Sequence, residues 1–504
     1  MNAGREINLK GQQKMKRFIT LLLLTAMLVS CGAGTSAEKD TTAGTTDSGT
    51  TDETSAAELT DNLPDMDMDG FVLSIYHNDQ EQMFWTNLLL DAESEAGEAL
   101  NDAVYLRNRA VEDRFNCKIE TTEFNGFQLS SSEISKEVMA GDSTYDVWFP
   151  RDYYLADSIP YIRPLSDLPY VNLSADWWFP NASSVFVFGD KQYSATSAFS
   201  LSMIARAGAL AFNKDMYENI GAEKTPYEYV RDNEWTLDTL ASVCKLAYRD
   251  LNGNAEMDKD DCYGISGWPK ELYARFINGS GVRFISTDEN GYPSFDLPKD
   301  QTAINKLMHI YDLFSDKAVY NNPDSIKRKT AEIDSLGVLK DNTTLFDYTN
   351  PHLMDTECRH YDVNVGFVVS PKYDSEQENY YSTTWAAETM VILKTLSDER
   401  LENVSAILEA LSFGGYKDVV PVYREKTMKG KSAQDVESEE MFDVVLDSMM
   451  FDFGLITWEG TVVNPIIAGI YASNDGNVVS TLAKLEGKIN GVIEDLNENL
   501  AAEQ

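Results

Sequence analysis

Short apolar strand patterns alternate with helical patterns along this chain, and that alternation constrains the fold more than any other feature of the sequence. Residues 71–78 alternate apolar and polar side chains as a strand does, residues 103–115 carry apolar side chains at helical spacing, and the strand pattern of residues 117–124 follows. Such alternation is typical of α/β lobes, in which helices cover a sheet. Because 504 residues exceed what one compact core holds, the sequence predicts an α/β fold with two lobes.

The same alternation continues through the middle of the chain. We expect a helix that stops at Gly141, followed by a short strand at 145–149. Residues 203–221 predict an apolar strand and then a helix that opens at Asn213, and Thr236 is the predicted N-cap of the next helix. The remaining predicted elements are a helix over 235–250, a strand at 263–268, a helix at 302–317, a strand pair at 344–348 and 363–371, and mainly helices after residue 394.

The charge of the chain limits the class of partner. The formal net charge is -40, while 43% of the residues are hydrophobic, as in globular proteins. Proteins bind phosphate backbones through lysine and arginine side chains that displace counterions. The composition therefore predicts no nucleic-acid partner.

The first residues have the pattern of an export signal. A basic stretch at residues 14–17 precedes the apolar run at 18–30, which is shorter than the about 20 residues that a membrane-spanning helix needs. We expect residues 1–30 to be a signal peptide. Translation starts at Met1 or at Met15, because MKRF is itself a normal signal start.

The residues after the apolar run predict a lipid anchor. Residues 28–31 read LVSC, which resembles the lipobox of bacterial lipoproteins, in which the cysteine is acylated, with palmitate among the acyl groups, and becomes the first mature residue. Several acyl chains can hold a soluble domain on a membrane. We expect lipidated Cys31 and a flexible tether over 31–63, because that segment is almost wholly small and polar and has no aromatic residue.

The other cysteines and the histidines give no metal or redox motif. No CxxC spacing occurs, and none of the four histidines lies in a ligand pair at helical spacing. Cys244 and Cys262 could form a disulfide across the loop between them. The alternative is that Cys117, Cys244, Cys262 and Cys358 are all small buried hydrophobic residues.

Six segments, taken in order behind the lipoprotein signal, resemble the extracellular solute-binding proteins of ABC importers, in particular family 1, the sugar-binding lipoproteins related to maltose-binding protein. The segments are AGDSTYDVWF, ALAFNKDMYENIG, EWTLDTLASVCKLAYRDLNGN, DCYGISGW, GSGVRF and VGFVVSPKYD. The resemblance runs from about residue 66 to about residue 460 and rests on the order and spacing of the segments.

The resemblance implies a two-lobed periplasmic-binding-protein-like fold with a hinge and an interlobe cleft. Residues 64–203 plus about 388–435 would form lobe 1, and residues 204–387 plus about 436–504 would form lobe 2. The chain would cross between the lobes near residues 204–211, 385–391 and 430–450.

The resemblance also implies a function. The chain would be a monomeric lipoprotein, anchored to the outer face of the cell membrane, that closes on a carbohydrate or oligosaccharide and delivers it to the permease subunits of an ABC importer. Ligand-driven closure of this kind is a common conformational transition. No cofactor is required for it.

Aromatic and charged residues that could hold a sugar follow one predicted strand. Sugar sites combine aromatic rings, which stack on C–H faces, with charged groups that bind hydroxyls. Trp148, Arg151, Asp152 and Tyr153 lie at the carboxyl end of a strand, where α/β sheets bind ligands, although their charges stand in the opposite order from the maltose-binding pattern. The alternative is that Trp148 belongs to the core and the charges face solvent.

Further candidates stand where the resemblance places pocket residues, although each aromatic residue alone is more often part of a core. These candidates are Arg206, Trp268, Tyr273, Tyr348, Trp385, Glu388 and Trp458. Trp177 and Trp178 have polar neighbours in the sequence, so we expect them either in a cleft wall or in a packed surface loop.

No sequence motif indicates catalysis. The chain has no GxSxG elbow, no HExxH and no phosphate-binding glycine loop with its lysine. We therefore expect no catalytic residues. The alternative functions are a secreted glycan-acting hydrolase, whose carboxylate pair no motif would reveal, and a structural surface lipoprotein.

The acidic loop DLNGNAEMDKDD has the oxygen spacing of a twelve-residue calcium loop. Its six candidate ligands are Asp250, Asn252, Asn254, Glu256 through its carbonyl, Asp258 and Asp261. Two departures favour the alternative of a solvent-facing turn. Ala255 stands where the calcium loop has glycine, and Asp261 stands where it has a longer glutamate.

Overall fold

In the computed structural model, the folded part of the chain begins at Thr60. The described residues are 59–83, 88–141, 143–258, 260–321, 337–384, 386–428, 436–472 and 476–502. The predicted signal peptide, Cys31 and most of the tether lie outside them, as does Trp385.

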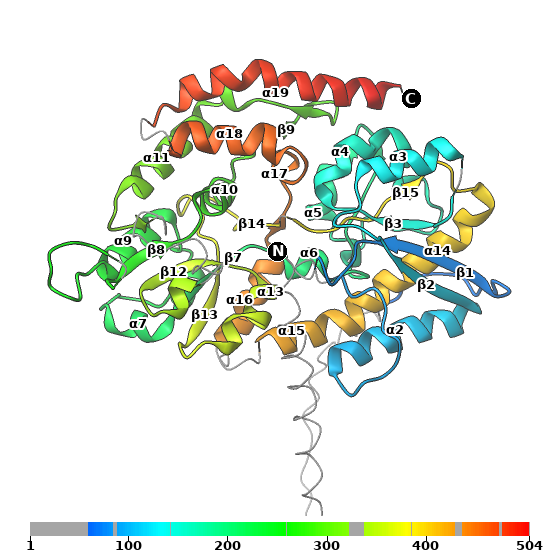
Figure 1. Cartoon of the computed structure of the whole chain (residues 1–504), viewed down its shortest axis with the longest axis horizontal. Helices are drawn as coiled ribbons and strands as arrows, with labels where there is room; N and C mark the ends of the chain where they lie inside the picture. The colour runs from blue at the N-terminus through cyan, green and yellow to red at the C-terminus, as the bar shows by residue number, and fades with distance from the viewer. Residues whose placement is uncertain are drawn as a thin grey trace, which may run out of the picture. The chain divides into compact units, whose positions relative to one another are not determined.

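The first lobe is built on a parallel three-stranded sheet in the order β2-β1-β3 (Figure 1). Its strands are β1 (Phe71–His77), β2 (Cys117–Glu123) and β3 (Val147–Phe149). Phe71 pairs with Cys117 and Ile75 pairs with Val147. All three strands lie where the sequence predicts strands, because each carries alternating or continuous apolar side chains that pack under helices.

Three helices pack around this sheet: α2 (Ala99–Phe115), α3 (Ser131–Ala140) and α14 (Asp398–Gly414). Ser130 and Glu133 form a capping box at the start of α3. Gly141 ends that helix with a φ of 75°, a conformation that glycine adopts without strain, so the predicted stop is confirmed.

Trp177 and Trp178 belong to a packed part of the first lobe and not to a cleft wall. Both are buried, and their indole N–H groups donate to the Oε1 and Oε2 atoms of Glu409 at 2.9 and 2.7 Å. The amide of Asn172 donates to Oε2 at 3.1 Å. The polar neighbours suggested exposure, but the buried carboxylate of Glu409 satisfies both indoles.

The second lobe is built on a mixed five-stranded sheet in the order β11-β8-β12-β7-β13. The strands are β7 (Ala209–Asn213), β8 (Tyr263–Ser266), β11 (Tyr320–Asn321), β12 (Thr344–Thr349) and β13 (Val365–Val369). β8 and β12 are parallel, whereas β7 is antiparallel to both of its neighbours. The predicted strand pair at 344–348 and 363–371 is therefore corrected, because β7 lies between the two strands.

Helices follow the strands of the second lobe. They are α7 (Lys214–Asn219), α8 (Pro226–Arg231), α9 (Leu237–Ala247), α10 (Pro269–Gly279) and α11 (Gln301–Ser315). Three of them lie where the sequence predicts helices, after Asn213, at 235–250 and at 302–317, and two, at 226–231 and 269–279, were not predicted. Asn213 caps α7 and Thr236 caps α9 through their side-chain oxygens. The predicted apolar strand at the start of residues 203–221 is confirmed from Ala209 onward as β7, but its first residues are wrong, because α6 (Ser202–Ala205) is a helical turn. A buried apolar run gives no periodicity that separates strand from helix.

Three chain segments run side by side where the chain passes between the two lobes. The Gly208 amide donates to the Thr383 carbonyl at 3.0 Å, and Ala207 bridges to Thr384. β14 (Ser382–Thr383) pairs in parallel with β16 (Met449–Met450). We call these three stretches, residues 207–208, 382–384 and 449–450, the crossing segments.

The end of the chain is helical, as predicted. It contains α15 (Val420–Met428), α16 (Val436–Asp447), α17 (Phe453–Thr457), α18 (Asn464–Ile467) and α19 (Val478–Ala501), with π-helical turns at Gly415–Val419, Glu459–Val463 and Ala468–Ala472. α19 contacts α11 of the second lobe and the 3₁₀ turn Ile159–Tyr161 of the first lobe.

Shorter elements complete the described fold. They are α4 (Leu155–Ser158), α5 (Pro180–Ser183), α12 (Gly337–Lys340), α13 (Pro351–Thr356), β4 (Ile162–Arg163), β5 (Val187–Phe188), β6 (Lys191–Gln192), β9 (Ser286–Thr287), β10 (Pro293–Ser294) and β15 (Ile392–Leu393). Among the helices that the structure describes, none is long and apolar enough to cross a membrane.

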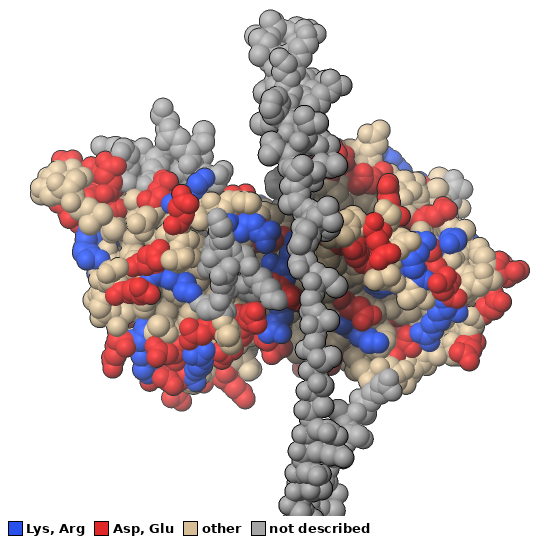
Figure 2. All heavy atoms as spheres, turned by 90° about the horizontal axis from the view of Figure 1, so that it is seen from below, with Lys and Arg blue, Asp and Glu red and all other residues tan. Residues whose placement is uncertain are grey.

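The charged side chains on the surface agree with the acidic composition of the chain. In the face that Figure 2 shows, acidic side chains are spread over the molecule and basic ones are scattered among them.

The four cysteines of the described residues are free and buried, so Cys244 and Cys262 form no disulfide. Burial raises the pKa of the Cys244 thiol well above its usual range.

Candidate functional site

The segment after β3 carries three of the predicted site residues of the first lobe. Arg151 forms a β-bridge with Glu388. The next residue is held by one backbone bond and one side-chain bond, since the Asp152 amide donates to the Ala387 carbonyl and the Ala387 amide donates to Asp152 Oδ2, both at 3.1 Å. Burial raises the pKa of Asp152 to about 7, although Arg151 lowers it. Tyr153 is 38% exposed, so its ring remains accessible.

Arg151 has an unused guanidinium. Its side chain makes no hydrogen bond or ion pair with any residue that the structure describes, although it acts electrostatically on Asp152, and its Nε atom is buried. A buried donor without a partner costs about 1–3 kcal/mol unless something else binds it. The arrangement leaves this cation available to an oxygen-rich ligand.

Arg206 lies at the end of α6, beside the crossing segments, and connects the two lobes electrostatically. It lowers the pKa of Asp152 in the first lobe and that of His352 in the second. The His352 pKa falls to about 4, first because the ring is buried and then because of Arg206. The half-buried position of Arg206 fits the expectation that a charge in this apolar stretch stands in a cleft or an ion pair.

The second lobe places another arginine on an aromatic ring. Arg275 in α10 is 3% exposed, and its guanidinium carbon lies 3.2 Å from the centroid of the Tyr348 ring. The Asn350 amide group donates to the Tyr348 hydroxyl at 2.8 Å. This stacking fixes Arg275 and Tyr348 together at the end of β12.

Asp347, next to Tyr348, is a second buried carboxyl group. Its Oδ1 accepts the Tyr348 amide at 2.7 Å, whereas its Oδ2 has no partner among the described residues. Burial raises its pKa well above the usual range. A Cβ atom at Gly267 would lie 2.9 Å from Asp347 Oδ1, so glycine is needed there for the close approach.

The segment after β16 bonds to the first lobe beside Tyr153. The Thr457 hydroxyl donates to the Tyr153 carbonyl at 3.2 Å and accepts the Ala156 amide at 3.1 Å. Trp458 follows and packs edge-on against Phe453, with ring centroids 5.0 Å apart. Glu459 forms an ion pair with Lys270 at the start of α10.

Two predicted site residues lie in hydrophobic cores. Trp148 is 2% exposed and packs edge-on against Tyr76 at 4.9 Å in the first lobe. Tyr273 is 6% exposed and stacks on Tyr471 at 3.9 Å in the second. We leave both out of the candidate site.

The remaining predicted residues, Trp268, Glu388 and Trp385, are each in a different environment or outside the described residues. Trp268 is half-buried at the N-cap of α10. Glu388 is 1% exposed, and its amide donates to the Ser202 hydroxyl at 2.9 Å, beside the first crossing segment. Trp385 cannot be placed, since it lies outside the described residues. The candidate site then consists of Arg151, Asp152, Tyr153, Arg206, Trp268, Arg275, Asp347, Tyr348, His352, Glu388 and Trp458.

Sequence reasoning missed Arg275, Asp347 and His352. The signal that could have found His352 is its position directly after a strand, in the sequence TLFDYTNPH. β8 and β12 are parallel neighbours, so the residues after both strands meet at one sheet edge. This neighbour relation depends on strand order, which the sequence did not reveal.

The acidic loop lies apart from these residues and holds itself together. Asp250 accepts the amides of Gly253 and Ala255 at 2.6 and 2.8 Å, and Asp261 accepts the Leu251 and Asp258 amides. Ala255 has a φ of 65°, so it takes the left-handed conformation that glycine has in a calcium loop. Across the described residues, no three His, Cys, Asp or Glu side chains are placed to hold a metal ion. Calcium binding here stays a prediction that depends on the asparagine and carbonyl oxygens.

The sequence matches no protein-family model and no curated protein. The structure, in contrast, resembles solved structures over most of its length. The cyclic alpha-maltosyl-1,6-maltose binding protein from Arthrobacter globiformis has a TM-score of 0.55 at 12% identity, covering 84% of this chain and 100% of that one. UspC of M. tuberculosis gives 0.55 at 14% identity with the same coverage.

A further solved structure is the GacH receptor of Streptomyces glaucescens, with a TM-score of 0.50 at 13% identity, covering 84% of this chain and 99% of that one. The chain has the two-lobed fold of the periplasmic solute-binding proteins. The α/β fold class that the sequence predicts is thereby confirmed.

Proposed function

We propose that this protein is an extracellular solute-binding lipoprotein that captures a carbohydrate or oligosaccharide between its lobes and delivers it to an ABC importer. The observation that carries the proposal is the convergence of polar groups from both lobes beside the crossing segments. Arg151 and Tyr153 come from the first lobe, Tyr348 and His352 from the second, and Arg206 from the connection. A solute held by all of them favours the closed state, because it contacts both lobes at once.

The chemistry of these residues suits a sugar. An arginine can donate two parallel N–H bonds to neighbouring hydroxyl oxygens, and Arg151 has donors to spare. The accessible ring of Tyr153 can pack on the C–H face of a pyranose. Two of the similar structures support this ligand class, since one is named as a maltosyl-maltose binding protein and the other was solved with acarbose.

Binding explains the site better than catalysis does. A glycosidase needs two carboxyl groups that face the scissile bond from opposite sides. Asp347 is 1% exposed and Asp152 is also 1% exposed, with an oxygen bound to the Ala387 amide, so neither carboxyl group projects freely toward a substrate. Of the three similar structures described above, one is named as a binding protein, one as a receptor and one only as UspC. None is named as an enzyme.

The lobe boundaries of this proposal follow the crossing segments. Lobe 1 comprises residues 64–203 and about 388–435, and lobe 2 comprises residues 204–387 and about 436–504. The bonds at Gly208, Thr383 and Met450 support crossings close to these positions. Closure would then rotate one sheet against the other about these segments.

Anchoring and delivery complete the proposal. Lipidated Cys31, after removal of the signal peptide, would hold the protein at the outer face of the cell membrane, and the tether would let it reach the permease subunits. The lipobox sequence LVSC and the basic n-region support this step. Metabolic labelling with a palmitate analogue should mark the wild-type protein and leave Cys31→Ala unmarked.

A thermal-shift screen of mono- and oligosaccharides, followed by analysis of the incubated ligand, tests the proposed function. A sugar that raises the melting temperature and is recovered intact supports a binding protein. Cleavage products would indicate a glycan-acting hydrolase, and no shift across a broad panel of sugars would contradict the carbohydrate assignment.

A further inference from the structure

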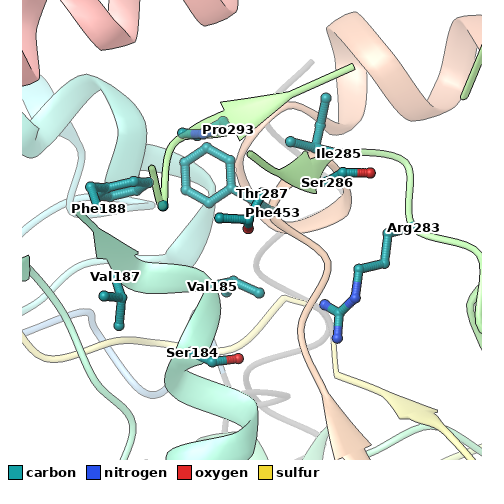
Figure 3. Close-up of a pocket in the computed structure, with 11 residues that line it drawn as sticks. Ser184, Val185, Val187, Phe188, Arg283, Ile285, Ser286, Thr287, Pro293 and Phe453 are labelled. Carbon is teal, nitrogen blue, oxygen red and sulfur yellow. The ribbon is translucent and has the colours of Figure 1, made fainter. Parts of the chain in front are cut away.

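A pocket lies between the lobes, and it shares no residue with the candidate site. Its volume is about 530 Å³, which falls in the range of small-molecule sites. The first lobe contributes β5 and the residues before it, and the second lobe contributes β9, β10 and Arg283 (Figure 3). We propose that this pocket binds a small carboxylic acid with an apolar body.

One side of the pocket is apolar. Val185, Val187 and Phe188 line it, and the Phe453 ring packs edge-on against Phe188 with centroids 5.5 Å apart. Phe188 and Phe453 are each 3% exposed, so their packing fixes this wall. A branched or aromatic hydrocarbon group gains free energy by covering such a surface, about 25 cal/mol for each Å² removed from water.

Arg283 supplies a cation across from the apolar wall (Figure 3). Its Nη1 donates to the Phe451 carbonyl at 2.7 Å, and the side chain has no other hydrogen bond or ion pair with the residues that the structure describes. The remaining N–H groups of the guanidinium therefore have no acceptor within the described chain. A carboxylate fits the planar fork of a guanidinium through two parallel N–H bonds, and its small size suits a pocket with an apolar wall.

The carboxyl group of Asp452, which Arg283 influences electrostatically, does not use these donors. Asp452 Oδ2 accepts the Asn278 side chain at 3.0 Å and the Phe284 amide at 2.6 Å, and Oδ1 accepts the Gly454 amide at 2.9 Å. The oxygens of Asp452 are thus occupied. Arg283 keeps its charge for a ligand in the pocket.

A ligand in this pocket would contact both lobes close to their connection. The hairpins that line it already meet, since the Gly189 amide donates to the Gly291 carbonyl at 3.3 Å. Phe451, the acceptor of Arg283, directly follows the crossing strand β16. Occupancy would therefore act on the same hinge as the candidate site while using separate residues.

Isothermal titration calorimetry on the whole protein tests the proposal. The ligand is 3-phenylpropionate, and the control is 3-phenylpropanamide, which has the same shape but no charge. We expect the acid to bind at least tenfold more tightly than the amide. Arg283→Gln should weaken acid binding at least tenfold, whereas Arg163→Gln, which removes another arginine bound to a backbone carbonyl, should leave it unchanged.

A second variant covers the case in which Arg283→Gln does not fold. Val185→Asp places a negative charge at a partly exposed position of the pocket wall and should abolish acid binding. Arg151→Ala separates the two sites, because it should weaken sugar binding and leave 3-phenylpropionate binding intact. Acid binding that survives both Arg283→Gln and Val185→Asp, or that is lost in Arg151→Ala, or an acid that does not bind at all, would overturn the proposal.

Discussion

The first lobe and the candidate site both contain buried charged groups, but they satisfy them differently. In the first lobe, Arg107 donates through Nε, Nη1 and Nη2 to Asn108, Phe199 and Leu90 at 2.7–2.9 Å, and both oxygens of Glu409 accept indole N–H groups. In the candidate site, Arg151 makes no hydrogen bond and Asp347 Oδ2 has no partner in the described chain. Saturated groups hold a fold together, and unsaturated ones mark a place for a ligand.

Replacing Glu409 by alanine should have the largest effect on stability. The change leaves two indole N–H groups and the Asn172 amide without an acceptor, and each buried donor costs about 1–3 kcal/mol. We expect a loss of about 4 kcal/mol in the free energy of unfolding, measured by urea titration. Glu409→Gln, which keeps one acceptor oxygen, should lose less than half of that. A loss below about 1 kcal/mol in the alanine variant would contradict the claim that the saturated buried groups of the first lobe hold its fold together.

Asp152 should make stability depend on pH. Its pKa is about 7 in the folded protein against 3.8 for an ordinary aspartate, so the folded state holds more protons between these values. Stability from this group is therefore lost as the pH rises from about 4 to about 7, and the loss is complete above 7, by roughly 4 kcal/mol in all.

Asp152→Asn removes this titration. Urea unfolding at pH 4.5, 6 and 8 should show the variant gaining on the wild type as the pH rises. Parallel stability curves for the two proteins would contradict the raised pKa.

The acidic loop is an intermediate case, because its carboxylates are satisfied by amides of the same loop. If it binds calcium, a concentration about thirty times the Kd should stabilise the protein by roughly 2 kcal/mol. Replacing both Asp250 and Asp258 by alanine should abolish the calcium-dependent rise in Tm, and Asp260→Ala, outside the six predicted ligands, should preserve it. An unchanged response in the double variant would exclude this loop.

Arg151 should show the smallest effect on stability. Since its guanidinium bonds to no described residue and its buried Nε lacks a partner, Arg151→Ala should not lower the free energy of unfolding. The same urea titration measures this. A loss of 2 kcal/mol or more would mean that Arg151 stabilises the fold and is not held ready for a ligand.

Local patterns in the sequence predicted the elements but not their neighbours. Gly141, Asn213 and Thr236 mark helix ends correctly because capping depends on residues close in sequence. The order β8-β12-β7-β13 depends on contacts between distant segments, which periodicity does not report.

The candidate site was predicted in part for the same reason. Arg151, Arg206 and Tyr348 are visible in the sequence as polar or aromatic residues beside strands, and the structure places them near the crossing segments. Trp148 and Tyr273 look the same in sequence yet are buried in cores, and His352 became visible only once β12 was placed beside β8. Burial alone does not separate these cases, since Tyr348 is as buried as Tyr273; what distinguishes Tyr348 is its contact with Arg275 at the end of β12.

Titration of a saccharide from the thermal-shift screen into wild type, Arg151→Ala and His352→Ala tests capture between the lobes most directly. Arg151 belongs to the first lobe and His352 to the second. Each variant should bind the sugar at least tenfold more weakly while still unfolding in a single cooperative transition. Full affinity in either variant would show that the sugar is held by one lobe alone, and this would contradict capture between the two.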